Sequence, residues 1–366
     1  MKKIKTLIIL PHMRTGGGQK LALDIAIGLH KINDFEVSVL CVGEAEENIF
    51  SKIADSNNIN VNYLNKKDGF SFKTCFDVLK YINKYKPDVV STHLRALTYV
   101  VLAALINRKP KYYHTVHNIA AKEAEDGLAT IEKIAYRYAG FTPIAISDFC
   151  KDTISDYYGI SNSKIPVIYN GIDTKRYSYS IPYENRDRKV IRIISTGRMQ
   201  PVKRHLIMIK AFSILHKKNP NTELFFLGDG ELRKDIENEI KNNNLEKCIK
   251  VCGVISDVQI ELNKAHIYLM ASEYEGLPLS VLEAMSCGLP IIATKAGGTI
   301  DIVDDSNGFL CDVDDSDQIA LALEMLTSNY ELRKKLSEGS VLKASKYDIS
   351  KCVEDYSNLF RKAVMN

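Results

Sequence analysis

The sequence lacks the cysteine patterns and long apolar runs that mark secreted, zinc-binding and membrane-spanning proteins. Its eight cysteines include no C-x-x-C pair, which favours reduced, buried thiols over a disulfide framework or a zinc site. No stretch approaches the roughly 20 apolar residues of a membrane span. The basic start MKKIKTLIIL has only a short apolar run before Pro11, whereas a signal peptide needs roughly 7–15 apolar residues. These absences predict a cytoplasmic protein, one that can still lie peripherally on the inner face of the plasma membrane.

The charge balance is too mild to indicate a nucleic-acid partner. The formal net charge of the 366 residues is +4, and 45% of them are hydrophobic, as in ordinary globular proteins. Residues 1–180 contain 24 Lys and Arg against 18 Asp and Glu, whereas residues 181–366 contain 25 against 27. A basic first half is compatible with an anionic membrane surface or a phosphorylated acceptor, and equally with an ordinary solvated surface.

Short apolar runs alternate with helical patterns along the chain, which indicates strand–helix–strand units. The first run, TLIIL at 6–10, is followed by a glycine-rich turn and then by a helix with Leu21, Ile25 and Leu29 on one stripe. Apolar runs without strict alternation are typical of strands buried on both faces of a parallel sheet. Because 366 residues exceed one ordinary core, we predict an α/β protein with two Rossmann-like domains.

A change in composition suggests where the two domains meet. The segment SYSIPYENRDRK at 178–189 is polar and lacks periodicity, as expected for an interdomain linker. We therefore predict one domain over 1–178 and another over 190–349. An amphipathic helix at about 350–366 closes the chain, and we expect it to pack back on the N-terminal domain. Two such sheets facing each other would form a cleft at the carboxyl ends of their strands, where ligands bind.

The first candidate site is the glycine-rich segment TGGGQK at 15–20, between a predicted strand and a predicted helix. Glycines allow the backbone to approach a ligand closely, and the N–H groups of a helix N-terminus favour an anion such as phosphate. The segment is not G-x-G-x-x-G, and no acidic residue follows at dinucleotide spacing, so NAD binding is not favoured. The alternative is a flexible turn without a function.

The second candidate site is STGRMQPVKR at 195–204, again between a strand and a helix. Arg198 and Lys203 are five residues apart, and two cations at the carboxyl end of a strand can both reach one diphosphate. Ordinary surface cations are the alternative. Arg204 is expected to face solvent.

The strongest pattern is ASEYEGLPLSVLEAMSCGLPIIAT at 271–294, a strand end followed by a loop and a helix. Pro278 is expected at the first helical position. Glu275 lies on the loop and Glu283 lies in the helix, so two carboxylates flank a helix N-terminus that can hold phosphate. Carboxylates accept hydrogen bonds from sugar hydroxyls, which suggests one acid for the donor hexose and one for a ribose.

This block resembles the E-x7-E signature of the retaining glycosyltransferases of family 4, and the resemblance covers essentially the whole chain. It includes the glycine-rich loop, HTVHN at 114–118, NGID at 170–173 and the G-R-x-x-x-x-K element that begins at Gly197. The resemblance implies the GT-B fold, in which two Rossmann-like domains face each other across a cleft. It also implies a hexosyltransferase-type enzyme that moves a sugar from a nucleotide sugar to an acceptor with retention of anomeric configuration.

The same resemblance implies roles for individual residues. Glu275 would face the transferred sugar and Glu283 the ribose, while Arg198 and Lys203 would grip the diphosphate and stabilise the leaving group. Further donor contacts would come from Gly16, Gly17 and Gly18 of the N-terminal domain, and from Gly276, Leu277 and Leu279, with backbone N–H groups acting at Gly16, Gly17, Leu277 and Leu279.

Three more positions follow from the resemblance. His117 would orient the donor sugar at its 6-hydroxyl, whereas His93 and His114 are expected to pack or to face solvent. Val254, after the strand IKVCG, is expected to bound the base pocket together with Ser256. Gln19 stands where the family commonly has Glu, which leaves any acceptor contact at that position open.

The resemblance supplies no carboxylate that could act as the nucleophile of a double displacement. We therefore expect a front-face, oxocarbenium-like reaction in which the departing phosphate helps to deprotonate the acceptor. Arg198 and Lys203 would take the place of a divalent ion, so we predict activity without metal and without a cofactor besides the donor. The acidic pairs 304–305 and 314–315 lie in predicted loops and are not assigned to a metal.

UDP-sugars are the first expectation for the donor and GDP-sugars the second, with a hexose or an N-acetylhexosamine transferred. The acceptor is expected to be a glycan or a lipid-linked oligosaccharide in the synthesis of a surface polysaccharide or glycolipid. Two alternatives are a sugar-nucleotide 2-epimerase on the same fold, which the motif combination disfavours, and a noncatalytic sugar-nucleotide-binding protein.

The donor motifs cluster after residue 195, so the C-terminal domain is expected to hold most of the nucleotide and the N-terminal domain to face the acceptor. In the N-terminal domain, KKDGFSFK at 66–73 and NRKPKYY at 107–113 both mix basic residues with aromatics. That composition suits an anionic membrane interface, and two solvated loops are the alternative.

Overall fold

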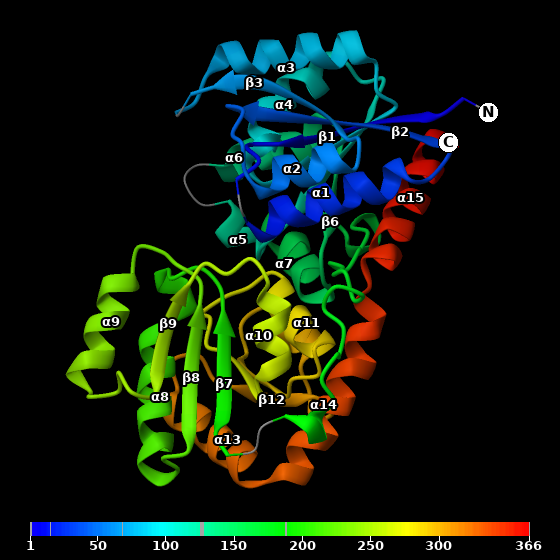
Figure 1. Ribbon diagram of the computed structural model, residues 1–366. Helices are drawn as coiled ribbons and strands as arrows, with labels where there is room; N and C mark the ends of the chain where they lie inside the picture. Colours follow the sequence, from blue (N-terminus) through cyan, green and yellow to red (C-terminus); the bar gives the residue numbers. More distant parts are fainter. Residues whose placement is uncertain (1, 15, 68, 125–127, 187–188, 366) are drawn as a thin grey trace. The chain divides into compact units, whose positions relative to one another are not determined.

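The structure is a computed structural model that describes residues 2–14, 16–67, 69–124, 128–186 and 189–365 (Figure 1). It divides into two compact units, residues 1–171 with 349–366, and residues 172–348. All eight cysteines are free thiols, and only Cys252 is exposed. In the part of the chain that the structure describes, no helix has the length and apolar character needed to cross a membrane.

The first unit is a parallel six-stranded sheet in the order β3-β2-β1-β4-β5-β6 with helices on both faces (Figure 1). Its strands are β1 (Ile4–Leu10), β2 (Phe35–Gly43), β3 (Asn60–Lys66), β4 (Val89–His93), β5 (Lys111–Val116) and β6 (Phe141–Ala145). Its helices are α1 (Gly17–His30), α2 (Ile49–Ser56), α3 (Phe72–Tyr85), α4 (Leu97–Ile106), α5 (Ala120–Glu123), α6 (Leu128–Tyr138), α7 (Asp148–Tyr158) and α15 (Ile349–Met365), with short 3₁₀ turns η1 (Leu94–Ala96) and η2 (Asn162–Lys164).

The second unit repeats this arrangement, with six parallel strands in the order β12-β11-β10-β7-β8-β9. Its strands are β7 (Ile191–Thr196), β8 (Thr222–Leu227), β9 (Ile249–Gly253), β10 (Ile267–Met270), β11 (Ile291–Thr294) and β12 (Gly308–Cys311). Its helices are α8 (His205–Lys218), α9 (Arg233–Asn242), α10 (Val258–Lys264), α11 (Leu279–Ser286), α12 (Thr299–Ile302), α13 (Ser316–Ser328) and α14 (Tyr330–Ala344), with 3₁₀ turns η3 (Tyr183–Asn185), η4 (Pro201–Lys203) and η5 (Ser345–Tyr347).

Counted within its own unit, each sheet has the Rossmann strand order 3-2-1-4-5-6. The order reverses direction between β1 and β4 in the first unit and between β7 and β10 in the second. In such sheets, ligands bind at this switch point, beyond the carboxyl ends of the strands. The strand order therefore marks one candidate ligand position in each unit.

The C-terminal helix α15 packs within the first unit. A β-carbon added to Gly28 of α1 would lie 2.3 Å from a methyl group of Val353, so the glycine lets the two helices approach closely. The Tyr356 hydroxyl hydrogen-bonds the Thr115 hydroxyl at 2.8 Å. The Arg361 guanidinium binds both carboxylate oxygens of Asp34, at 2.8 and 3.1 Å.

The segment 178–189, expected as a linker, instead packs inside the second unit where it is described. The Tyr183 hydroxyl donates to the carbonyl of His266 at 2.7 Å. Buried Arg186 donates to the carbonyl of Cys287 at 2.7 Å. The polar composition was misleading because these side chains satisfy buried carbonyl groups of the unit. The boundary between the units lies earlier, at residues 171 and 172.

Candidate active site

The predicted donor residues of the second unit follow strands at one edge of its sheet. Arg198 and Lys203 come after β7, and Glu275 comes after β10. These are the two strands that flank the switch point. The topology therefore brings the basic and acidic motifs, far apart in sequence, to the position where open parallel sheets bind ligands.

Close backbone contacts fix the loop that carries Arg198. A β-carbon on Gly228, whose φ is +144°, would lie only 1.9 Å from the carbonyl oxygen of Gly197. The N–H of Met199 also donates to the carbonyl of Asp229 at 2.9 Å. The glycine-containing turn after β8 thus holds the Arg198 loop by main-chain contacts, which side-chain changes do not easily disturb.

Lys203 and Glu275 form an ion pair at this edge, with 2.5 Å between the ammonium nitrogen and Oε1. The Ser272 hydroxyl donates to the same oxygen at 2.6 Å. A main-chain bond joins the two loops, because the N–H of Glu273 donates to the carbonyl of Val202 at 2.8 Å. Two side chains therefore hold the Glu275 carboxylate, and both of them contact Oε1.

The glycines after β11 support the same loop from the other side. Gly297 has φ +59°, and a β-carbon there would lie 1.9 Å from the carbonyl oxygen of Glu275. The N–H of Gly298 donates to that oxygen at 3.3 Å. Any side chain at Gly297 would push the Glu275 loop away, so these glycines position the acid.

The electrostatics of Lys203 favour the charged ammonium. Burial acts to lower its pKa, but the Glu275 carboxylate outweighs burial, and the pKa of Lys203 lies above its ordinary value. The positive charge of Arg198 also acts on this ammonium. Arg198 and Lys203 bring two positive charges to this edge of the sheet, which suits an anion such as a diphosphate.

Glu283 lies in α11 and accepts a hydrogen bond from Tyr177, a residue to which the sequence reasoning gave no role. The Tyr177 hydroxyl donates to the Glu283 carboxylate, and burial together with this carboxylate raises the pKa of Tyr177. Arg176 next to it places its guanidinium 5.8 Å from the Tyr177 ring and donates to the carbonyl of Ser256 at 3.2 Å. Tyr177 thus orients Glu283, and Arg176 ties this segment to the loop after β9.

The start of α11 differs slightly from expectation. Pro278 is the N-cap residue rather than the first helical residue, because its ψ of 111° is extended and the helix begins at Leu279. Gly276 and Leu277 are buried just before it. Val254, expected to bound a base pocket, follows β9 and is 82% exposed.

In the first unit, the predicted residues also lie near a switch point. The glycine-rich segment follows β1, and Thr15 of that segment lies outside the described residues. Gly16 caps α1, which starts at Gly17. A β-carbon on Gly18 would lie 2.9 Å from Leu94 and 3.3 Å from Nδ1 of His117, so a glycine is needed where the helix start meets that ring. Gln19 is buried, and its amide lies 3.3 Å from Nδ1 of His12.

His117 is half-buried and pairs with buried His93, a contact that the sequence reasoning missed. Its Nε2 lies 3.0 Å from Nδ1 of His93, the last residue of β4, and Nε2 of His93 lies 3.4 Å from the Ser91 hydroxyl. Burial lowers the pKa of His117 to about 4 and holds that of His93 well below its ordinary value. Both rings are therefore neutral at pH 7, and each tautomer depends on the other. His93 was expected to pack or to face solvent, and it packs as a partner of His117.

A buried acid fixes the backbone of His117. The side-chain carboxyl group of Glu123, in α5, accepts the N–H of His117 at 2.9 Å. Its other oxygen lies 3.8 Å from Nε2 of His114. Burial, and then the neighbouring Glu132, raise the pKa of Glu123 to about 8. Burial raises the pKa of Glu132 to about 7, although the Tyr158 hydroxyl that bonds it acts the other way.

Two acidic residues after β12 are engaged in ion pairs. Asp312 and Asp314 have the D-x-D spacing, but Asp312 pairs with Lys295 at 2.7 Å and Asp314 pairs with Arg204 at 3.0 Å. Arg204, expected to face solvent, is thus half-buried between acids. Among the described residues, no three His, Cys, Asp or Glu side chains come together as a group that could hold a metal ion.

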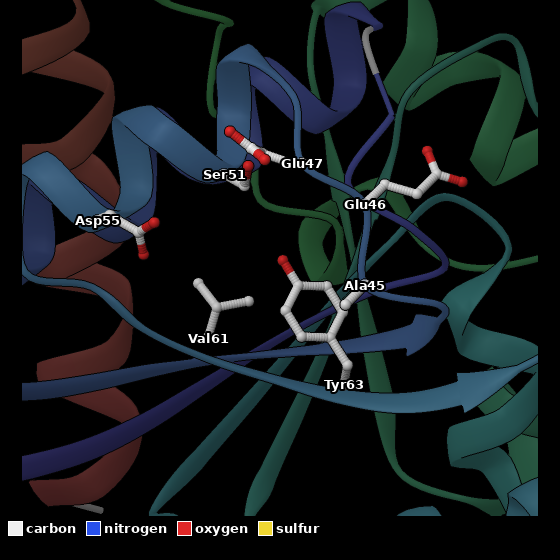
Figure 2. Close-up of a pocket in the computed structure, with 7 residues that line it drawn as sticks. All are labelled: Ala45, Glu46, Glu47, Ser51, Asp55, Val61 and Tyr63. Carbon is white, nitrogen blue, oxygen red and sulfur yellow. The ribbon is translucent and has the colours of Figure 1, made fainter.

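A separate cavity of about 280 Å³ lies in the first unit (Figure 2). Tyr63 and Val61 rise into it from β3, and Asp55 faces it from α2. The loop before α2 supplies Glu46, which binds Arg14 at 2.7 Å, just before the glycine-rich segment. None of the predicted donor residues lines this cavity.

Comparison with known protein families gives one match in each half of the chain. The model described as "Glycosyltransferase Family 4" matches residues 15–176. The model described as "Glycosyl transferases group 1" matches residues 181–341. The chain belongs to the glycosyltransferases of group 1 and family 4. The expected family and the expected GT-B type of fold, with two Rossmann-like domains, are thereby confirmed.

Three similar proteins place this glycosyltransferase among its relatives. An uncharacterised glycosyltransferase of Haemophilus influenzae is 32% identical over a matched region that covers 46% of this chain and 48% of that relative's length. An Escherichia coli enzyme named UDP-Gal:alpha-D-GlcNAc-diphosphoundecaprenol alpha-1,3-galactosyltransferase is 26% identical, with 80% of each chain covered. The crystal structure of Anabaena Alr3699/HepE in complex with UDP-glucose superposes with a TM-score of 0.85 at 20% identity, covering 98% of this chain and 99% of that one.

Proposed function

We propose that this glycosyltransferase moves a hexose or N-acetylhexosamine from a UDP-sugar to a lipid-linked acceptor, with retention of configuration. The observation that carries the proposal is the pairing of Lys203 with Glu275 beside Arg198 at the switch point of the second unit. The name of the Escherichia coli relative gives a UDP-sugar donor and a diphosphoundecaprenol acceptor. The Anabaena structure of the same fold contains UDP-glucose.

The charges at the switch point suit the leaving group. As the bond between sugar and diphosphate breaks, negative charge develops on the phosphate. Arg198 and Lys203 would stabilise that charge, together with N–H groups at the start of α11. Such fixed positive groups do the work that a divalent ion does in other enzymes, so we propose activity without metal.

The two glutamates would divide the remaining contacts. Glu275 is held by Lys203 and Ser272 at the switch point, where it would accept hydrogen bonds from hydroxyls of the transferred sugar. Glu283, oriented by Tyr177, would accept from the ribose hydroxyls. No residue is assigned as a covalent nucleophile, so the acceptor hydroxyl would attack on the face that the diphosphate leaves, and its proton would pass to the departing phosphate.

In the first unit, His117 and the glycine-rich segment would complete the donor contacts. His117 is neutral, so Nδ1, the ring nitrogen that does not meet His93, would bond a sugar hydroxyl without adding charge. The N–H groups of Gly16 and Gly17 at the start of α1 would face the phosphate. Gln19 bonds His12 and is not assigned to the proposed donor site.

A two-step experiment tests this function. A thermal-shift screen of UDP- and GDP-sugars first identifies the donor, because a ligand that binds only the folded state raises the melting temperature. The chosen donor is then incubated with and without polyprenyl-diphosphate-linked acceptors, and the anomeric configuration of the product is read by NMR. Conversion of the donor sugar to an epimer without acceptor, or binding without any transfer, would contradict the proposal.

A further inference from the structure

Three phenylalanines stand largely in solvent at the start of α3. The exposed fractions are 54% for Phe70, 76% for Phe72 and 52% for Phe76. Scattered exposed apolar residues are common, but three aromatic rings within seven residues form a patch, and such patches mark places where a partner binds. The donor chemistry proposed above makes no use of them.

The rings are held in place by a neighbouring helix. Phe70 stacks on Tyr99 of α4, with 5.6 Å between ring centroids, and meets the edge of Phe72 at 4.9 Å. The Tyr99 hydroxyl donates to the carbonyl of Gly69 at 3.4 Å. The apolar group is therefore presented outward by packing beneath it, which lowers the entropy cost of binding.

The helix itself is two-sided. Phe72, Phe76 and Lys80 are spaced four residues apart and are all exposed, so they share the outward face. Val78 and Ile82 are fully buried on the opposite side. The outward face thus combines aromatic rings with lysine, and α3 stays anchored in the unit by its inner face.

Positive charge surrounds the rings. Residues 66–84 contain five lysines and two aspartates. Lys67 and Lys73 are exposed, and the ammonium of Lys66 lies 5.4 Å from the centre of the Tyr99 ring. Aromatic rings bordered by lysines suit the boundary of an anionic bilayer, where rings enter the headgroup level and cations meet lipid phosphates.

The second segment expected at a membrane, residues 107–113, does not have these properties. Tyr112 and Tyr113 are only 3% and 7% exposed, because they belong to β5 and pack in the core. The Arg108 guanidinium donates a hydrogen bond to the carbonyl of Tyr138 at 2.8 Å. The expectation for this segment was wrong, since its aromatic residues serve the sheet.

We propose that the α3 surface, defined as Lys66, Lys67, Phe70, Phe72, Lys73, Phe76 and Lys80, binds a bilayer containing anionic lipid. The phenyl rings enter the interface and the lysines pair with anionic headgroups, so attachment is peripheral and reversible. This inference concerns where the first unit meets a membrane, and it does not depend on which donor or acceptor the enzyme uses.

Vesicle cosedimentation tests the charge requirement. The probes are phosphatidylcholine vesicles with and without phosphatidylglycerol, at low and physiological salt. Changing Lys66, Lys67 and Lys73 to Gln should weaken binding roughly a hundredfold, because each basic residue near such a surface contributes about fivefold. The matched control changes Arg108, Lys109 and Lys111 to Gln, which removes the same charge from the same unit and should cost far less.

A second pair of variants tests the rings. Phe72→Ser with Phe76→Ser should weaken binding on the order of tenfold per ring. Leu321→Ser with Leu342→Ser, which removes two side chains of 59% and 71% exposure from the second unit, should leave it unchanged. Circular dichroism of each variant checks that the fold is intact.

The absence of tryptophan from the chain allows a direct reading of insertion. Phe72→Trp places a single tryptophan in the α3 surface, and its emission should shift to shorter wavelength and be quenched by brominated lipid when anionic vesicles are added. Leu342→Trp, the control, should show neither change.

The proposal would be overturned if the Lys66, Lys67 and Lys73 variant bound anionic vesicles as well as the Arg108, Lys109 and Lys111 control. It would also be overturned if the emission of Phe72→Trp did not change when vesicles were added. If wild type binds no vesicles and the Phe72→Ser, Phe76→Ser variant differs from it in oligomeric state, then the α3 surface binds a second copy of the chain and the membrane assignment is wrong. Failure of this proposal leaves transfer to a water-soluble acceptor analogue unaffected, whereas failure of the proposed function leaves vesicle binding unaffected.

Discussion

The ammonium of Lys203 lies 2.5 Å from the carboxylate of Glu275, although 72 residues separate them in the chain. The sequence motifs suggested separate tasks for the two residues, one at the diphosphate and one at the sugar. Their contact makes them a unit, in which each side chain holds the other in place and the Glu275 carboxylate favours the charged ammonium of Lys203.

The first prediction follows from this contact. Lys203→Ala and Glu275→Ala should each lower turnover by roughly 10²-fold or more, as for a lost transition-state donor. The double variant should lose little beyond the worse single variant, because residues that act together are not additive. Arg198→Ala should also lose roughly 10²-fold. Steady-state kinetics measure this, with exposed Lys210→Ala as the control. Fully multiplicative losses in the double variant would contradict the coupling.

The second prediction separates the two glutamates. Glu283→Ala should weaken binding of bare UDP, because the ribose loses its acceptor, whereas Glu275→Ala should bind UDP nearly normally and fail in transfer. Tyr177→Phe removes the hydroxyl that orients Glu283 and should weaken UDP binding by a smaller factor. Calorimetric titration with UDP decides, and equal UDP affinity in all three variants would refute this division of roles.

The third prediction concerns the histidine pair. His93→Leu removes the partner of His117 Nε2 and should lower kcat roughly tenfold with little change in the donor KM, since His93 orients a ring and touches no substrate. His93→Asn keeps a polar atom near the position of Nδ1 and should recover part of the loss. His117→Ala should be worse than either, and adding His93→Leu to it should change nothing more. A loss in His93→Leu that persists on the His117→Ala background would mean a purely structural role.

The fourth prediction is activity in excess chelator. Asp312 and Asp314, which have the D-x-D spacing, pair with Lys295 and Arg204, and the Asp315 side chain caps α13. Arg198 and Lys203 are proposed to neutralise the leaving group. Turnover after EDTA treatment should therefore match that of untreated enzyme. Complete loss with EDTA, restored by magnesium or manganese, is the outcome that would reject this.

Much of this architecture was predictable, because buried parallel strands and glycine-rich turns have strong local signals. The E-x7-E and G-R-x-x-x-x-K patterns also led directly to Glu275, Glu283, Arg198 and Lys203. The 178–189 segment was misjudged because a polar composition does not reveal that Arg186 meets a buried carbonyl.

The residues that support the site were harder to find. Tyr177 and His93 act through contacts between segments far apart in the chain, Tyr177 with Glu283 and His93 with His117. No spacing in the sequence encodes such pairs. Gly297 and Gly228 could have been suspected as turn residues, but only the fold shows that they lie against the backbone carbonyls of Glu275 and Gly197. Supporting contacts of this kind depend on tertiary packing, whereas the residues proposed to meet the ligand come from local motifs.

The last prediction concerns Glu123, which accepts the N–H of His117, and its neighbour Glu132. Glu123 and Glu132 keep their protons to about pH 8 and pH 7 in the folded chain, chiefly because of burial. In the unfolded chain, a glutamate loses its proton near pH 4.3. Between these values each acid binds more protons in the folded state than in the unfolded state, so the contribution of these two acids to stability falls as pH rises through this window and levels off above about pH 8.

Glu123→Gln removes this proton-binding difference at one position, and its amide oxygen can still accept the N–H of His117. The melting temperature of Glu123→Gln minus that of wild type should therefore increase from pH 5 to pH 8, by roughly a few degrees, and then stay constant. Exposed Glu246→Gln should show no such trend. Scanning calorimetry across this range measures the difference. A difference that is flat or decreasing with pH would show that Glu123 is ionised in the fold, and that His117 N–H meets a carboxylate rather than a neutral acid.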